Sequence, residues 1–245
     1  MTGGPLTRAS AEFYRWHLIE PPVNASEIAE LSEFRGRILH ANGRRPVFAH
    51  SDGGYSDDDP LDMTSVHVTV RTEGELVACI RIRPLPEHAK SSLGRLVTSA
   101  QLDGLLEGMR LVHNDCVEVG RWIVAPSVRG TAVAWTLVVS CWAVARWMGK
   151  RCMLVTAGAR DGQVTMLSRF GGQVLHAFHS RFLEEYDDEL LPMYFDLDRP
   201  PPRVAALLQS VERLLNLRDS GDCPGEFVAA FRSRIPSRMD SAQSV

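Results

Sequence analysis

The residues best suited to chemistry are charged side chains inside an apolar run. Glu118 and Arg121 interrupt a stretch rich in valine, tryptophan and isoleucine over residues 116–124. Such charges need partners, because burying an isolated charge is costly. The carboxylate is a candidate general base, and the guanidinium is a candidate anchor for another carboxylate. Three positions apart on a regular strand, the two side chains should face opposite sides, and a salt bridge across the sheet is the alternative role for either.

A second set of charges comes earlier in the chain. Asp59 and Asp62 lie in an acidic loop, and Arg81 follows on an apolar strand. A guanidinium aimed at either aspartate would form a bidentate anchor. Loop aspartates are more often solvated charges or helix caps. Arg81 can equally be an ordinary residue on the polar face of its strand. Arg35 belongs to an earlier helical segment, and Phe48 is the aromatic residue that follows it.

A turn of small residues after the Glu118 strand opens an apolar helix. The first N–H groups of a helix have no partner within it, and the helix dipole adds positive potential there. The turn therefore predicts a phosphate cradle. Unpaired N–H groups at the end of the preceding strand would hold the rest of the ligand. The strand end is Trp122-Ile123-Val124, and the cradle is Arg129-Gly130-Thr131-Ala132-Val133-Ala134.

Hydrophobic periodicity predicts the elements that position these residues. A helix capped by Asn24 or Ser26 should end near Asn42-Gly43, and a hairpin should turn at Glu73-Gly74. The later helices are expected over 93–109, 128–148, 159–170 and after the prolines 200–202, and the later strands over 116–124, 151–156, 173–182 and 191–197. The order indicates a mixed α/β (α+β) sheet, with a loose leader (1–22), one domain (23–198) and a helical C-terminal tail (199–245).

Composition limits the classes of function. The 245 residues are 44% hydrophobic and 23% charged, which suits a globular core. A net charge of −3 argues against general nucleic-acid binding. The five cysteines lack metal-ligand spacing, so we expect free thiols and no metal site. Without a signal-peptide pattern or an apolar run of about 18 residues, the chain is expected to be cytoplasmic and to have no membrane span.

The segment Arg129 to Ala134 resembles the pyrophosphate-binding arm of the GNAT acyltransferase superfamily, Arg/Gln-x-x-Gly-x-Gly/Ala. Ala132 stands where the family usually has glycine. The later segment Met166-Leu-Ser-Arg-Phe-Gly171 is similar to the one that precedes the last hairpin of the family. This resemblance implies a GNAT-like fold over roughly residues 24–198.

The charged residues, in their order along the chain, resemble those of acyl-homoserine lactone synthases and long-chain N-acyl amino acid synthases. The resemblance covers about residues 30–180 and implies acyl transfer to a small-molecule amine from acyl-CoA or an acyl carrier protein, with no tightly bound cofactor. It implies Glu118 and Arg121 as catalytic residues, Trp122–Val124 and Arg129–Ala134 as the donor site, and Arg35, Phe48, Asp59, Asp62 and Arg81 as the acceptor site. The lactone synthases carry a tryptophan before the paired aspartates. Here the nearest aromatic residue is Phe48, which favours the N-acyl amino acid branch over S-adenosylmethionine as acceptor.

Two other functions stay open. One is an acetyl-CoA-dependent N-acetyltransferase, in which the Asp59, Asp62 and Arg81 set would be structural. The other is a non-catalytic acyl-CoA-binding module with residues 203–235 as its interaction helix. His67, alone on a strand, is more typical of a structural histidine than of a catalytic one. The tryptophans at 135, 142 and 147 are expected to pack in the core first and to line an acyl tunnel second.

Overall fold

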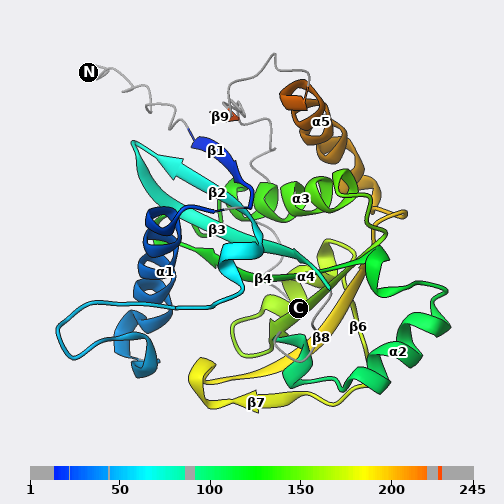
Figure 1. Cartoon of the computed structure of the whole chain (residues 1–245), viewed down its shortest axis with the longest axis horizontal. Coiled ribbons are helices and arrows are strands. Elements are labelled where there is room, and N and C mark those ends of the chain that lie inside the picture. The colour runs from blue at the N-terminus through cyan, green and yellow to red at the C-terminus, as the bar shows by residue number, and fades with distance from the viewer. Residues whose placement is uncertain (1–13, 22, 44, 86–91, 220–225, 228–245) are drawn as a thin grey trace, which may run out of the picture.

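One mixed sheet with helices on both faces organises the computed structural model (Figure 1). The structure describes residues 14–21, 23–43, 45–85, 92–219 and 226–227. Among them, the strands lie in the order β6-β8-β5-β4-β3-β2-β1-β9, and β7 pairs with β8. The strands are β1 (Tyr14–Ile19), β2 (Val66–Thr72), β3 (Glu75–Pro84), β4 (Cys116–Val124), β5 (Cys152–Gly158), β6 (Gln173–Val174), β7 (Arg181–Leu183), β8 (Asp188–Asp196) and β9 (Glu226–Phe227).

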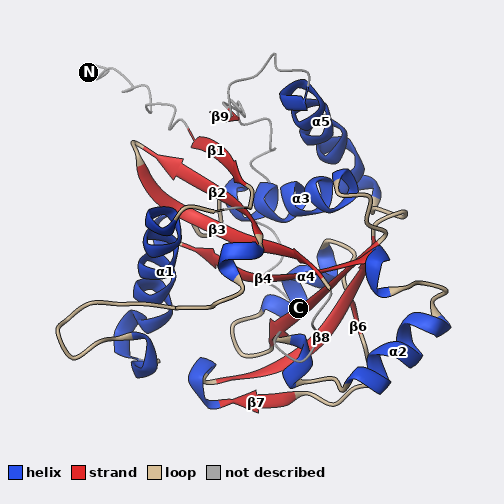
Figure 2. Ribbon diagram, in the orientation of Figure 1, coloured by secondary structure: helices blue, strands red, loops and turns tan. Residues whose placement is uncertain are grey.

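The first two helices begin where the sequence supplies caps. The Asn24 side chain accepts from the first turn of α1, and Glu27 completes a capping box. Thr98 and Gln101 do the same for α2. Figure 2 shows how the helices lie around the sheet. They are α1 (Ala25–His40), α2 (Ser99–Gly108), α3 (Ala132–Trp147), α4 (Gln163–Arg169) and α5 (Pro202–Asp219).

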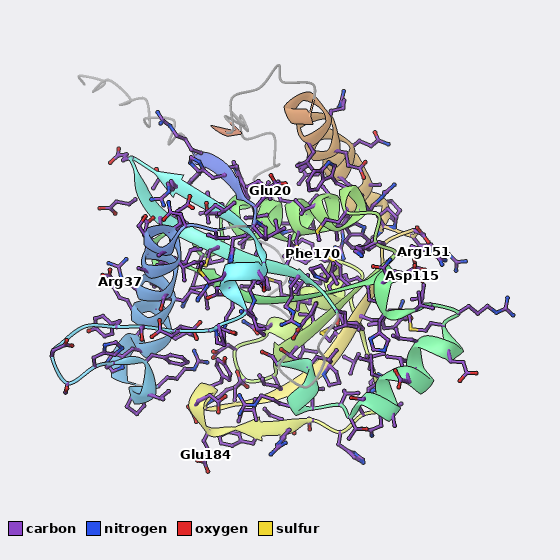
Figure 3. The ribbon with its side chains drawn as sticks, viewed as in Figure 1. Glu20, Arg37, Asp115, Arg151, Phe170 and Glu184 are labelled. Carbon is purple, nitrogen blue, oxygen red and sulfur yellow. The ribbon has the colours of Figure 1, made fainter. Side chains whose placement is uncertain are left out.

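β4 and β5 are parallel neighbours, joined by α3. The residues just before the two strands are joined by a backbone hydrogen bond of 2.8 Å from Arg151 N to Asp115 O, and Figure 3 shows these two residues side by side. The ladder between the strands runs only from Cys116 to Val119 on β4. Beyond it, β4 pairs with β3 and β5 pairs with β8. The two strands therefore diverge. After Val119, the edge of β4 that points toward β5 has no strand partner among the described residues.

The two faces of the sheet carry different helices. Alternation along β4 places Glu118 and Cys116 on one face and Val117 and Val119 on the other. Cys116 packs in a cluster with residues of α2, whereas Val117 and Val119 pack in the cluster that contains α3. The outer side of α3 is covered by α5, whose Val204 and other apolar residues are buried. α3 is consequently buried on nearly every side.

The expected elements are mostly confirmed, with four corrections. The helix expected over 93–109 begins at Ser99, because Leu93–Arg95 forms a separate 3₁₀ turn. The leader was expected to be loose, but its residues 14–19 form β1, which pairs with β2. The strand expected over 173–182 is instead two short strands, β6 and β7, separated by a turn. The helix expected from 128 begins at Ala132, because Pro126–Val128 forms a 3₁₀ turn. The helical tail is confirmed as α5, which packs on α3 of its own chain; residues 220–225 and 228–245 lie outside the described residues.

No helix in the described part of the chain is both long and apolar enough to cross a membrane.

Candidate functional site

Three arginines and three aspartates form a closed ring in which charges alternate. Asp57 lies between Arg35 and Arg121, at 2.9 Å from Arg35 Nε and 3.2 Å from Arg121 Nε. Asp59 lies between Arg121 and Arg81, at 2.9 and 2.8 Å. Asp62 closes the ring, at 2.8 Å from Arg81 and in contact with Arg35. The expected meeting of Asp59 and Asp62 with arginines is confirmed, and the six charges balance.

The ring is assembled from elements far apart in the sequence. Arg35 comes from α1, Arg81 from β3 and Arg121 from β4, whereas the aspartates come from the loop after α1. That loop is held against α1 by the Asp57 N–H, which donates to Ser32 O at 3.1 Å. The helix offers no side chain at Gly36, so the loop backbone passes directly over it. The loop can therefore place its carboxylates under the sheet.

The ring shifts the pKa values of Arg121, Asp59 and Arg35. Burial opposes the charge of Arg121, but the attraction of Asp57 and Asp59 outweighs it and raises the pKa of the guanidinium. Burial likewise opposes the charged form of Asp59, but Arg81 outweighs it and lowers the pKa of this carboxyl to about 2. Arg35, fully buried, also has a raised pKa because Asp62 and Asp57 outweigh its desolvation. All three groups are therefore charged at neutral pH.

An irregularity in β4 brings Arg121 to this ring. Positions 79 to 81 on β3 face positions 123 to 120 on β4, so β4 contains one extra residue there. Arg121 has φ 52°, in the left-handed region that costs a non-glycine residue about 1–3 kcal/mol. On a regular strand Arg121 and Glu118 would face opposite sides, and that expectation is wrong. The extra residue turns the Arg121 side chain to the face of Glu118 and Arg81.

The aromatic residue Tyr186 also contacts Arg121 of the charged ring. The Tyr186 hydroxyl contacts Arg121 Nη1, and the guanidinium lies 5.9 Å from the centre of the Tyr186 ring. Phe48 is buried, and its ring centre lies 5.9 Å from that of Tyr186, while its role in acceptor binding stays a prediction. Burial raises the pKa of Tyr186, although Arg121 opposes this shift. The phenol is therefore neutral and can hydrogen bond to the guanidinium without adding charge.

Glu118 lies outside the ring, in a buried pair with Arg83. The two residues are opposite each other on β4 and β3, and Arg83 Nε lies 3.6 Å from Glu118 Oε2. Leu93 N–H donates to Glu118 Oε1 at 3.1 Å. Glu118 Oε2 accepts no hydrogen bond from the described residues. One carboxylate oxygen therefore remains able to accept a proton or a donor from a ligand.

The predicted cradle lies where β4 diverges from β5. Thr131 caps α3 by accepting from Val133 N–H at 3.2 Å, and Gly130 has φ 78°, which favours glycine. Arg129 is exposed, and its Nε–H donates to Val124 O at 3.1 Å. Ala132 and Ala134 are half-buried in the first turn, as are Trp122 and Ile123 on the strand. The Trp122 indole N–H has no hydrogen-bond partner among the described residues.

The remaining sequence candidates are His67 and the tryptophans of α3, of which Trp147 is 37% exposed, so that its expected packing in the core is wrong. His67 Nε2 lies 2.9 Å from Asp62 O, and burial lowers the pKa of the imidazole, which is therefore neutral. Trp142 is buried and donates to Leu197 O at 3.3 Å, so it packs in the core as expected. Trp135 contacts the buried Phe170, with ring centres 4.1 Å apart and the ring planes tilted, and Figure 3 labels Phe170 near the centre of the view. No cluster of metal-ligating side chains occurs in the described part of the chain.

Sequence reasoning missed Asp57, Tyr186 and Arg83. Asp57 and Asp59 alternate in an extended loop, while Asp58 points away to Ser32 at 2.6 Å. That alternation would have identified Asp57 as the partner of Asp59. Nothing near Tyr186 in the sequence signals its position, because tertiary structure alone brings it to Arg121.

Residues 43–139 match a family model described as an acetyltransferase (GNAT) domain. The match contains the three aspartates, β3, β4 and the start of α3. No curated protein sequence matches the chain.

Several solved structures share this fold at low sequence identity. TofI, in a ternary complex with an inhibitor and MTA, has a TM-score of 0.55 at 17% identity, over 79% of this chain and 96% of that chain. BjaI, a CoA-dependent acyl-homoserine lactone synthase with SAM and isopentyl-CoA, has a TM-score of 0.56 at 15% identity, over 83% and 90%. MesI, another CoA-dependent acyl-homoserine lactone synthase, has a TM-score of 0.53 at 17% identity, over 81% and 95%. The GNAT-like fold is therefore confirmed.

Proposed function

We propose that this chain, whose residues 43–139 match a GNAT acetyltransferase domain, moves an acyl chain from a phosphopantetheine thioester to the amine of a small amino-acid-like acceptor. The thioester is carried by CoA or by an acyl carrier protein. The observation that carries the proposal is the divergence of β4 from β5 next to the start of α3, on a strand that also bears Glu118 and Arg121.

The donor fits this divergence for two reasons. The first turn of α3 supplies N–H groups and positive potential for the phosphates. Residues 120–124 of β4 pair with β3 on one edge only. Their other edge, which points toward β5, has backbone groups without a strand partner, and the pantetheine arm would lie along it. A preorganised donor aimed at the thioester oxygen typically contributes about 2.7–4 kcal/mol to transition-state stabilisation.

The acceptor needs a base, since an ammonium group cannot attack. Glu118 takes a proton from the ammonium, and the free amine attacks the thioester carbonyl carbon. A C–N bond forms, the C–S bond breaks, and the leaving thiolate takes up a proton. Glu118 Oε2 suits this role because Leu93 N–H fixes the other oxygen while Oε2 accepts no hydrogen bond from the described residues.

The ring contributes by fixing the geometry of β4. Asp57 and Asp59 hold Arg121 in a strained backbone conformation, and this conformation accompanies the extra residue between Glu118 and the strand end. The proposed base and the proposed oxyanion donors therefore stay in register with each other. Aspartates of the chain itself neutralise both Arg35 and Arg121.

A product assay tests the proposal. Purified protein is given acyl-CoA thioesters from acetyl to long-chain, and the same acyl groups on an acyl carrier protein, with amino acids or S-adenosylmethionine as acceptors. We expect an N-acyl product by mass spectrometry, lost in Glu118→Gln. Preference for acetyl-CoA would favour the second candidate, an N-acetyltransferase, which the description of the matching family model supports. Donor binding without any product would indicate a non-catalytic module.

A further inference from the structure

Arg83 and Glu118 are a buried pair in which one hydrogen-bonding atom of each side chain is not used. Their exposed fractions are 5% and 3%. The 3.6 Å between Arg83 Nε and Glu118 Oε2 is longer than a hydrogen bond. Arg83 Nη1 and Glu118 Oε2 are both buried and have no hydrogen-bond partner in the part of the chain that the structure describes.

This arrangement is costly for a structural pair. A buried ion pair repays its desolvation only when its geometry is good and further hydrogen bonds satisfy the remaining atoms. Native proteins rarely leave buried polar atoms unpaired, and the exceptions ask for an explanation. A ligand that carries both a cation and an anion would satisfy both partners at once.

Open space lies next to the pair. Gly120 follows Glu118 by two positions, faces the same side of β4 and lies opposite Arg81. A Cβ built on Gly120 would have no heavy atom within 4 Å, and the residue is half-buried rather than sealed. A small group can therefore lie over Gly120, in the position that a side chain would otherwise fill.

The arginines of the ring are poorly suited to the same ligand. Arg35 and Arg121 each bridge two aspartates, so each is already neutralised, although each leaves one nitrogen without a hydrogen bond. A ligand carboxylate there would compete with carboxylates of the chain. Among the described residues Arg83 is paired with a single carboxylate, that of Glu118, at a distance that leaves room for an added anion, and its Nε also donates to Pro84 O at 3.4 Å.

We propose that Arg83 and Glu118 bind the two charged groups of a free α-amino acid, the carboxylate on Arg83 and the ammonium on Glu118 Oε2. One carbon separates these groups in the ligand, and the two side chains are direct neighbours across β3 and β4. The pair and the zwitterion are each neutral, so binding buries no net charge. This inference rests on the proposed function and assigns its acceptor class: the proton that Glu118 removes comes from the ammonium it binds.

The wild-type protein gives the first test, with no variant needed. Acyl transfer to the standard L-amino acids is compared with transfer to their carboxamides, which keep the amine and lose the negative charge. We expect the amides to lose about 10- to 100-fold in kcat/KM, the range of a charged hydrogen bond. Equal use of acids and amides would overturn the inference and leave the proposed function standing.

Variants locate the site. Arg83→Gln should raise the acceptor KM by a similar factor, remove the preference for acids over amides, and leave the donor affinity measured by calorimetry unchanged. Arg83→Lys, which keeps the charge, should retain part of the preference. Gly120→Val should fill the open space and raise the acceptor KM, whereas Gly104→Val on the exposed side of α2 should not. Retention of the acid preference in Arg83→Gln would place the carboxylate elsewhere.

Binding separates this inference from the proposed function. If no acceptor is acylated, the proposed function fails, and calorimetry with the free amino acids decides the inference alone. Binding that is lost in Arg83→Gln and in the carboxamides would support the site. Absence of binding to the folded wild-type protein would overturn it.

Discussion

Gly36 of α1 lies in direct contact with the backbone of Ser56. A Cβ on Gly36 would come within 2.5 Å of the Ser56 amide nitrogen, closer than real Cβ atoms approach. The next residue after Ser56 is Asp57, which bridges Arg35 and Arg121. The absence of a side chain on one helical residue therefore sets the position of the loop that supplies every aspartate of the ring.

Gly36→Ala should displace this loop and destabilise the protein. The clash is with backbone, which cannot rotate away, and overpacking of this kind costs about 1–3 kcal/mol. Chemical denaturation measures the loss. Gly104→Ala in α2 is the matched control, because no atom lies within 4 Å of its added Cβ, and it should be neutral or stabilising. Equal stability of Gly36→Ala and wild type would mean that the loop does not depend on this contact.

Asp57→Asn should cost far more stability than Asp58→Asn. Asp57 is buried and holds two arginines, so its loss leaves the ring with an extra positive charge, at about 3–5 kcal/mol. Asp58 is exposed and bonds to the Ser32 and Ser56 hydroxyls, so its amide should cost about 0.5 kcal/mol. Urea unfolding measures the free energy of unfolding of the two variants. Similar losses in both would show that the ring does not stabilise the fold.

The local elements could be predicted from the sequence because they depend on local patterns. β4 has the limits that its apolar run indicates, and α1 begins at the cap that Asn24 provides. β1 was predicted as leader although Trp16 and Leu18 alternate with Arg15 and His17, a strand pattern that its pairing with β2 explains.

The site could be predicted only as a set of residues. The resemblance brought together Arg35, Asp59, Asp62, Arg81 and Arg121, and the structure confirms that they meet. The ion pairs that join these residues could not be predicted. The extra residue in β4 turns the Arg121 side chain toward the aspartates, and it depends on how β4 pairs with β3. The pairing of Glu118 with Arg83, away from the ring, could not be predicted either, because it too depends on the register between β3 and β4.

Acid should destabilise the protein through Asp59. The pKa of this carboxyl is lowered to about 2, against 3.8 for the ordinary group, since Arg81 outweighs the desolvation. A lowered pKa means that the stabilisation is complete above the unfolded pKa and is lost as the pH falls from about 4 to about 2. Discounted for solvent screening, the loss should be about 1–2 kcal/mol. Denaturation midpoints from pH 5 to 2 should fall less in Asp59→Asn, and parallel curves would exclude this contribution.

Glu118→Gln should keep the fold and lose the reaction. Glutamine still accepts from Leu93 N–H, so the local backbone stays in place, but it cannot take a proton. Loss of a general base typically lowers kcat by about 10²–10⁴. Turnover is measured with a saturating donor, and circular dichroism checks the fold. Glu107→Gln on the exposed side of α2 is the control, and near-full activity of Glu118→Gln would exclude Glu118 as the base.

The nature of the donor carrier can be tested through positive charge near the start of α3. Arg169 is exposed at the end of α4, and the next residue, Phe170, lies 4.1 Å from the ring of Trp135 in the first turn of α3. At the other end of α3, Arg146 is paired with Glu212 of α5 at 3.3 Å. The cations near the cradle are therefore better placed to attract an acidic carrier protein.

With an acyl carrier protein as donor, turnover should fall with added salt and in Arg169→Glu. Exposed charges are screened beyond about 8 Å at physiological ionic strength, and electrostatic docking affects mainly the association rate. Initial rates at limiting donor measure this effect. Turnover with the matching CoA thioester should depend less on salt, and Arg146→Glu should change neither donor's salt dependence. Equal salt sensitivity for the two donors, or a strong preference for CoA, would indicate a CoA-dependent enzyme.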